Sequence, residues 1–118
     1  MFGLPVGVDL TFLLGAALIQ VCIGENEVVL NFDSDVSIMC ASTVRYTRVG
    51  GAAESLDDAR DAGKVLVELL SAVIEGASGS TDGTLLLRWS SGGQVELLDS
   101  WKEYESYTVR HGETMIVV

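Results

Sequence analysis

The sequence is poor in positive charge, and this scarcity limits the partners that the protein can have. Seven lysines and arginines stand against seventeen aspartates and glutamates, so the formal net charge is −10 at pH 7. A field of this sign repels phosphate backbones and anionic membrane surfaces. We therefore expect no nucleic acid and no membrane as partners, whereas a basic protein fits the sign of the charge.

Long apolar runs are also absent. The apolar stretch at residues 12–23 is shorter than the roughly 20 residues that a membrane-spanning helix needs. It does not resemble a secretory signal either, because Asp9 precedes it and no lysine or arginine does. We expect a soluble, cytoplasmic protein.

Cysteine and histidine are too scarce to suggest a disulfide framework or a metal site. Cys22 and Cys40 stand among apolar neighbours at strand positions, and we expect both to be buried, reduced thiols. His111 is the only histidine and stands beside Gly112. It could serve as a general base or as one ligand of a metal, but no metal-ligand spacing accompanies it, and a turn residue is the favoured interpretation. We expect no metal and no cofactor.

Catalytic motifs are missing as well. The glycine-rich run at residues 76–80 follows an expected helix instead of opening one, and it lacks the lysine of a P-loop. No nucleophile-elbow pattern occurs, and a single histidine leaves little room for a serine or cysteine triad. Residues 33–35, Asp-Ser-Asp, resemble a paired-acid metal grip, but aspartate and serine are also the expected formers of a hairpin turn. The sequence favours a non-catalytic protein over an enzyme.

What the sequence does contain is an alternating hairpin pattern that occurs twice. Residues 28–39 and 85–98 each place apolar side chains at every second position, break at a polar or glycine turn, and resume the alternation. This pattern is typical of two half-buried antiparallel strands. The match extends to an internal repeat of roughly 13–49 and 69–110. The two hairpins either join in one sheet or face each other.

The remaining segments complete an α+β prediction for a single domain of residues 1–118. Leu56, Leu66, Leu69 and Leu70 belong to an apolar stripe at three- and four-residue spacing, which predicts one main helix at about 55–75 that begins near Ser55. We expect a short helical turn at 10–15 and further strands at 16–23, 43–49, 104–110 and 114–118. The predicted fold is an antiparallel sheet of two repeated strand-hairpin units with the helix packed on it.

The second hairpin and the segment after it resemble a family of small bacterial proteins known only as a domain of unknown function. The resemblance covers roughly residues 69–118 and rests on an apolar-x-aromatic strand, a glycine turn, an alternating strand and a tetrad. In this sequence these are Leu87-Arg88-Trp89, Gly92-Gly93, Val95-Glu96-Leu97 and Tyr104-Glu105-Ser106-Tyr107. The resemblance implies a small α+β fold and an association with bacterial toxin and immunity neighbourhoods. It implies no catalytic residue.

The tetrad and the two tryptophans supply the candidate binding residues, which are Trp89, Trp101, Tyr104, Glu105 and Tyr107. Aromatic rings with polar tips suit small-molecule and protein contacts, although they more often close the end of a core. Strand parity places Glu105 beside Tyr107, where a half-buried carboxylate needs a partner. Glu105 could bind a ligand or transfer a proton; a hydrogen bond to a backbone turn, or pairing with Arg88 or Arg110, is the structural alternative.

Two hypotheses follow. The first is a non-catalytic interaction protein that binds a basic partner, of the immunity type, or forms a homodimer that covers the apolar segment Met115–Val118. The second is a small-molecule binder or weak enzyme that uses Trp89, Tyr104, Glu105 and Tyr107. The acidic charge and the missing catalytic pattern favour the first.

Overall fold

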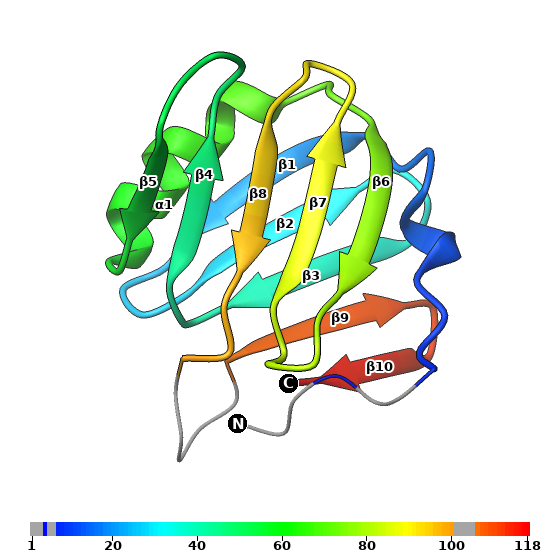
Figure 1. The fold of residues 1–118 in the computed structure, drawn as a ribbon. Helices are drawn as coiled ribbons and strands as arrows, with labels where there is room; N and C mark the ends of the chain where they lie inside the picture. Colours follow the sequence, from blue (N-terminus) through cyan, green and yellow to red (C-terminus); the bar gives the residue numbers. More distant parts are fainter. Residues whose placement is uncertain (1–3, 5–6, 101–105) are drawn as a thin grey trace.

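The protein consists of two five-stranded antiparallel sheets that pack face to face (Figure 1). The structure is a computed structural model, and it describes residues 4, 7–100 and 106–118. The first sheet has the order β1-β2-β3-β9-β10, with the strands Leu18–Ile23, Val28–Phe32, Val36–Cys40, Tyr107–His111 and Thr114–Val117. The second has the order β5-β4-β8-β7-β6, with Ala53–Leu56, Val44–Thr47, Gln94–Leu97, Leu85–Trp89 and Ile74–Gly79. The predicted α+β class with antiparallel hairpins is confirmed.

Alternation of apolar and polar residues determines which side of each strand is buried. In β2, β3 and β7 every second side chain is buried, as the period of a strand requires. The inward side chains of both sheets form one core, in which the ring of Phe32 stacks on Trp89 with centroids 6.0 Å apart. The two similar hairpins therefore face each other in separate sheets, which is one of the two arrangements that the sequence left open.

The main helix is shorter than predicted. The helix α1 spans Ala59–Leu66, the 3-10 helix η2 spans Val67–Leu69, and β6 begins at Ile74, so the predicted helix at 55–75 is wrong at both ends. Asp58, not Ser55, caps the helix, because its carboxylate accepts a hydrogen bond from the backbone N–H of Arg60 at 2.8 Å. Ser55 lies in β5.

Similar elements precede the first strand of each hairpin unit. The 3-10 helix η1, Thr11–Leu13, stands before β1, and η2 stands before β6. A residue with positive φ stands two positions after each of them, Gly15 at 85° and Ser71 at 75°. Both β1 and β6 begin with a register shift. Each half also contributes strands to both sheets, since β4 of the first half pairs with β8 and β9 of the second half pairs with β3. These features are what the predicted internal repeat would give, and the repeat itself stays a prediction.

Different segments close the two open ends of the sandwich. At one end α1 contacts β1, β2 and β5, and at the other end η1 contacts β6 (Figure 1). Gly63 of α1 lies so close to β1 that an added Cβ would overlap the side chain of Ile23, which is itself 46% exposed. The helix therefore packs directly on β1 at this end.

The structure also bears on the membrane prediction. Among the described residues, no helix has the length and apolar character that crossing a membrane requires.

Candidate functional site

The two described members of the predicted aromatic cluster lie in the core. Tyr107 is fully buried and Trp89 is 2% exposed. The indole Nε1 of Trp89 is buried without a hydrogen-bond partner among the described residues. Trp101, Tyr104 and Glu105 lie outside the described residues, so a binding site made from them stays a prediction.

The end of the tetrad instead ties the two sheets together. The hydroxyl of Tyr107 on β9 donates a hydrogen bond to the carbonyl oxygen of Gly83 at 2.5 Å, and the hydroxyl of Ser106 donates to Oδ1 of Asp99 at 2.8 Å. Gly83 and Asp99 belong to the second sheet's loops. Burial, and then the nearby negative charge of Asp99, raises the pKa of Tyr107 far above its usual value. The hydroxyl therefore stays protonated and serves as a structural donor.

Other singled-out residues lie at strand ends and turns. The exposed His111 ends β9, and its ring stacks on Phe12 with centroids 4.8 Å apart. Asp33 lies in the turn that joins β2 to β3, and its Oδ1 accepts a hydrogen bond from the backbone N–H of Ala17 at 3.0 Å. No three His, Cys, Asp or Glu side chains converge on a metal position in the part of the chain that the structure describes.

The prediction of two buried thiols is half wrong. Cys40 is buried, and this burial raises the pKa of its thiol. Cys22 is exposed because the register of β1 places it opposite Val29, on the outer face of the first sheet. Each strand of a two-sheet sandwich turns only one face to the core, and Cys22 lies on the other face.

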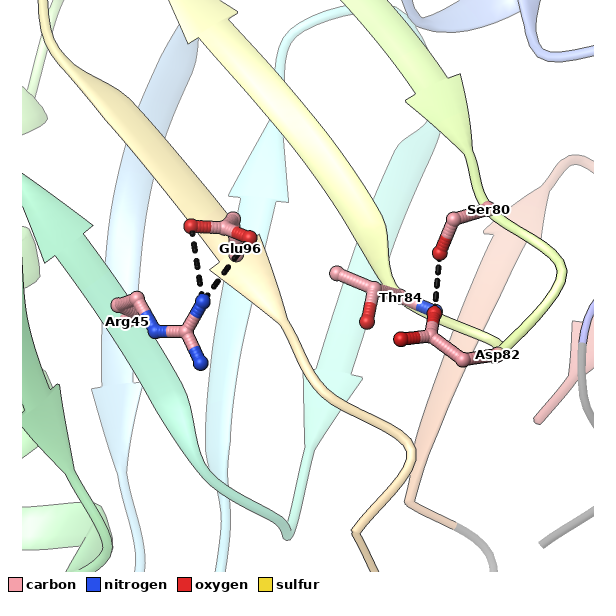
Figure 2. A network of polar contacts seen from close by, with 5 residues as sticks. All are labelled: Arg45, Ser80, Asp82, Thr84 and Glu96. Carbon is pink, nitrogen blue, oxygen red and sulfur yellow. Dashed lines mark hydrogen bonds and ion pairs between the residues drawn. The ribbon is translucent and has the colours of Figure 1, made fainter.

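A polar hollow lies on the outer face of the second sheet. One row of outward side chains crosses four strands, since Arg45 on β4 is opposite Glu96 on β8, which is opposite Leu86 on β7 and then Ser78 on β6. Nη1 of Arg45 lies 3.3 Å from Oε2 of Glu96 (Figure 2). Both side chains are partly exposed, so this ion pair contributes little to stability.

The turn between β6 and β7 forms the other wall of this hollow. Oδ1 of Asp82 accepts hydrogen bonds from the hydroxyl of Ser80 and from the backbone N–H of Thr84, the latter at 3.0 Å (Figure 2). These donors, the Ser80 hydroxyl most of all, lower the pKa of Asp82 below its usual range. Asp82 is therefore a fixed, ionised carboxylate at the rim.

Together these walls enclose an acidic cleft of about 470 Å³. It is bordered by Arg45, Asp82, Glu96 and Asp99, and it includes the half-buried leucines Leu86 and Leu98. Among the described lining residues, one arginine against three carboxylates gives 1 − 3 = −2. The cleft can accept an ammonium or guanidinium group with an apolar stem, because its carboxylates supply acceptors and its leucines supply an apolar surface.

A second hollow adjoins the acidic cleft. A groove of about 530 Å³ runs between the second half of β6, residues 77–79, and the segment that carries η1, and it shares residues 78–80 with the cleft. Leu4, Val8, Leu10 and Leu14 line it, and Asp9 is its one charged side chain. We call it the edge groove. No sequence pattern predicted it, because residues 76–80 look like a loop and not like the edge of a sheet.

The residues of the acidic cleft were not among the predicted candidates. The signal was present in part: Arg45 and Glu96 stand at polar positions of alternating segments, and Asp82 precedes a glycine at a turn. The missing information was the pairing of β4 with β8, which brings residues about fifty positions apart side by side.

Comparison with known proteins adds no relative: no protein-family model matches the chain, and neither a curated protein nor a solved structure is significantly similar to it.

Proposed function

We propose that this protein is a non-catalytic interaction module that binds a basic protein partner at the acidic cleft. The observation that carries the proposal is the cleft itself, with a charge of −2 over its described lining residues, its leucines and its fixed Asp82 carboxylate. The net charge of −10 adds a long-range field that draws a basic partner in and accelerates association. An immunity-type inhibitor of a basic toxin is the form of this function that the sequence resemblance suggests.

A charge-removal experiment tests the cleft. The probe is a fluorescein-labelled oligolysine of ten residues, titrated with the protein at low salt and followed by fluorescence anisotropy. Asp82→Asn combined with Asp99→Asn keeps side-chain oxygens for the local hydrogen bonds and removes two charges. We expect the affinity to fall about tenfold, since each lost charge pair contributes on the order of 0.5–1 kcal/mol.

The matched control removes two charges elsewhere. Glu25 and Asp61 are exposed and lie on the β1–β2 turn and on α1, outside both hollows. The variant Glu25→Gln with Asp61→Asn has the same net charge as the cleft variant. An equal loss of affinity in the two variants would show that oligolysine senses only the overall charge, and the cleft would lose its assigned role.

Self-association is the second form of the proposed interaction. The outer face of the first sheet carries a row without charge, made of Cys22, Val29, Met39, Thr108 and Val117 in consecutive register. Of the apolar segment that prompted the homodimer prediction, Val118 is buried within the fold, whereas Met115 is 48% exposed. Sedimentation at micromolar concentration measures this directly, and a single monomeric species would remove the homodimer from the proposal.

A further inference from the structure

We propose that the edge groove captures an extended segment of the basic partner, which pairs with β6 as an additional strand. This inference rests on the proposed function, since it states how the partner that the acidic cleft attracts is held. Recognition would use the unpaired backbone groups of β6, the apolar edge groove, and the carboxylates on either side of β6.

The backbone of β6 offers unpaired hydrogen-bonding groups along the groove. The Ser80 N–H donates to the carbonyl oxygen of Thr84, so Ser80 faces β7. Because antiparallel residues alternate in the direction of their backbone groups, Ala77 and Gly79 direct their N–H and C=O groups away from β7. Both residues line the groove, and within the described residues nothing pairs with that side of them. An added strand would satisfy these groups.

The edge groove has a counterpart at the opposite end of the sandwich. At that end, Ile23 on the edge strand β1 packs against Gly63 of α1. Counting 56 residues onward, the offset between the positive-φ residues Gly15 and Ser71, Gly79 occupies the position of Ile23. At Gly79 the tip of Leu4 takes this place, because a Cβ added to Gly79 would overlap it. An apolar side chain of a bound segment would pack beside Leu4 in the edge groove.

Charge complementarity identifies the segment further. A strand added beside β6 lies about 4.8 Å from it and directs alternate side chains to opposite faces. Side chains level with Ala77 and Gly79 enter the edge groove, and those level with Ser78 and Ser80 lie on the side of the acidic cleft. Asp9, whose pKa is lowered by hydrogen bonds from Thr11, adds a carboxylate at the groove. The geometry fits alternating apolar and basic residues.

The other outer strands lack this combination. β1 and β5 are contacted by α1, as β6 is contacted by η1, but neither β1 nor β5 borders the edge groove or the acidic cleft. β10 has Met115 exposed, but neither of the two hollows described above borders it. Of these outer strands, β6 is the one that borders both the edge groove and the acidic cleft.

Backbone methylation of a probe peptide tests the inference. The probe is a labelled eight-residue peptide of alternating valine and lysine, and its binding to the intact protein is followed by anisotropy. Valines that fill the groove must have their N–H groups directed at β6, whereas the lysine N–H groups are directed at solvent. We expect N-methylation of the valines to weaken binding about tenfold or more, and N-methylation of the lysines to change it less than about threefold.

Two protein variants test the same contacts from the other side. Ala77→Pro removes one outward N–H and leaves the bonds to β7 in place, which an edge strand tolerates. Gly79→Ile fills the groove and displaces the tip of Leu4, the nearest side chain. We expect each variant to bind the valine-lysine peptide about tenfold more weakly and to bind oligolysine as before. Circular dichroism checks that both variants remain folded.

The outcomes separate this inference from the proposed function. Equal effects of the two methylation patterns, or no effect of either, would overturn strand addition while the oligolysine result stands. A peptide that binds Ala77→Pro and Gly79→Ile as tightly as the unchanged protein would also overturn it. If cleft and control variants bind oligolysine equally, the proposed function fails, whatever the peptide does.

Discussion

The hydroxyl of Tyr107 lies 2.5 Å from the carbonyl oxygen of Gly83, and this hydrogen bond joins the first sheet to the β6–β7 turn of the second. Both residues are buried, so the carbonyl has no water to replace the hydroxyl. The same turn carries Asp82, and the residue after Gly83 is Thr84; both border the acidic cleft. A core contact therefore supports the geometry of the candidate site.

Tyr107→Phe should lower the free energy of unfolding by about 1–3 kcal/mol, because it leaves the Gly83 carbonyl buried without a donor. Urea unfolding followed by circular dichroism measures the change. Tyr46→Phe is the control, since the Tyr46 ring is also buried, while its hydroxyl makes no hydrogen bond to the described residues. Both variants keep the ring, so a loss of the same size in both would assign the effect to removal of a hydroxyl and not to the bond with Gly83.

Alkaline pH should destabilise the protein through Tyr107. Burial raises the pKa of Tyr107 in the folded state, whereas an unfolded tyrosine titrates near about pH 10. The unfolded chain then releases the Tyr107 proton at a lower pH than the folded protein. The contribution of Tyr107 to the free energy of unfolding is therefore full below about pH 10 and falls by about 1.4 kcal/mol per pH unit above it. Unfolding curves of the wild type and Tyr107→Phe should therefore converge above about pH 10. Parallel curves would contradict the assignment.

Local alternation made the hairpins predictable. Val36, Ile38 and Cys40 share one face in the sequence pattern and are buried together in β3. Turns were predictable for the same local reason, since Asp33 and Gly92 belong to residue types that form tight turns. The prediction succeeded where a strand's neighbours in sequence determine its environment.

Elements whose character depends on distant partners were not predictable. Residues 74–79 contain two glycines and small side chains, and they form β6 only because β7 provides a partner along their length. Glu54 and Ser55 look like a helix start, yet they pair with β4. The acidic cleft depends on the crossing of β4 into the second sheet, so its residues could not be grouped from the sequence alone.

The two cysteines should differ in reactivity. Cys22 is exposed on the outer face of the first sheet, whereas Cys40 is buried with a raised thiol pKa. Because the thiolate is the reacting species, a thiol reagent such as Ellman's reagent should modify one equivalent quickly in the native protein. The second equivalent should react only at the rate of unfolding or in urea. Rapid reaction of both thiols would place Cys40 in a more open environment than the structure shows.

Leu66 and Leu70 belong to the same predicted helical stripe, and the structure separates them. Leu66 ends α1 with no exposed surface, whereas Leu70 follows η2 and is 44% exposed. Leu66→Ala should cost about 2–5 kcal/mol of unfolding free energy, since it leaves a cavity between the helix and the sheets. Leu70→Ala should cost less than about 1 kcal/mol, because little apolar surface returns to water. Urea unfolding of both variants compares the two directly; equal losses would mean that the helix continues past Leu69, as the sequence pattern had predicted.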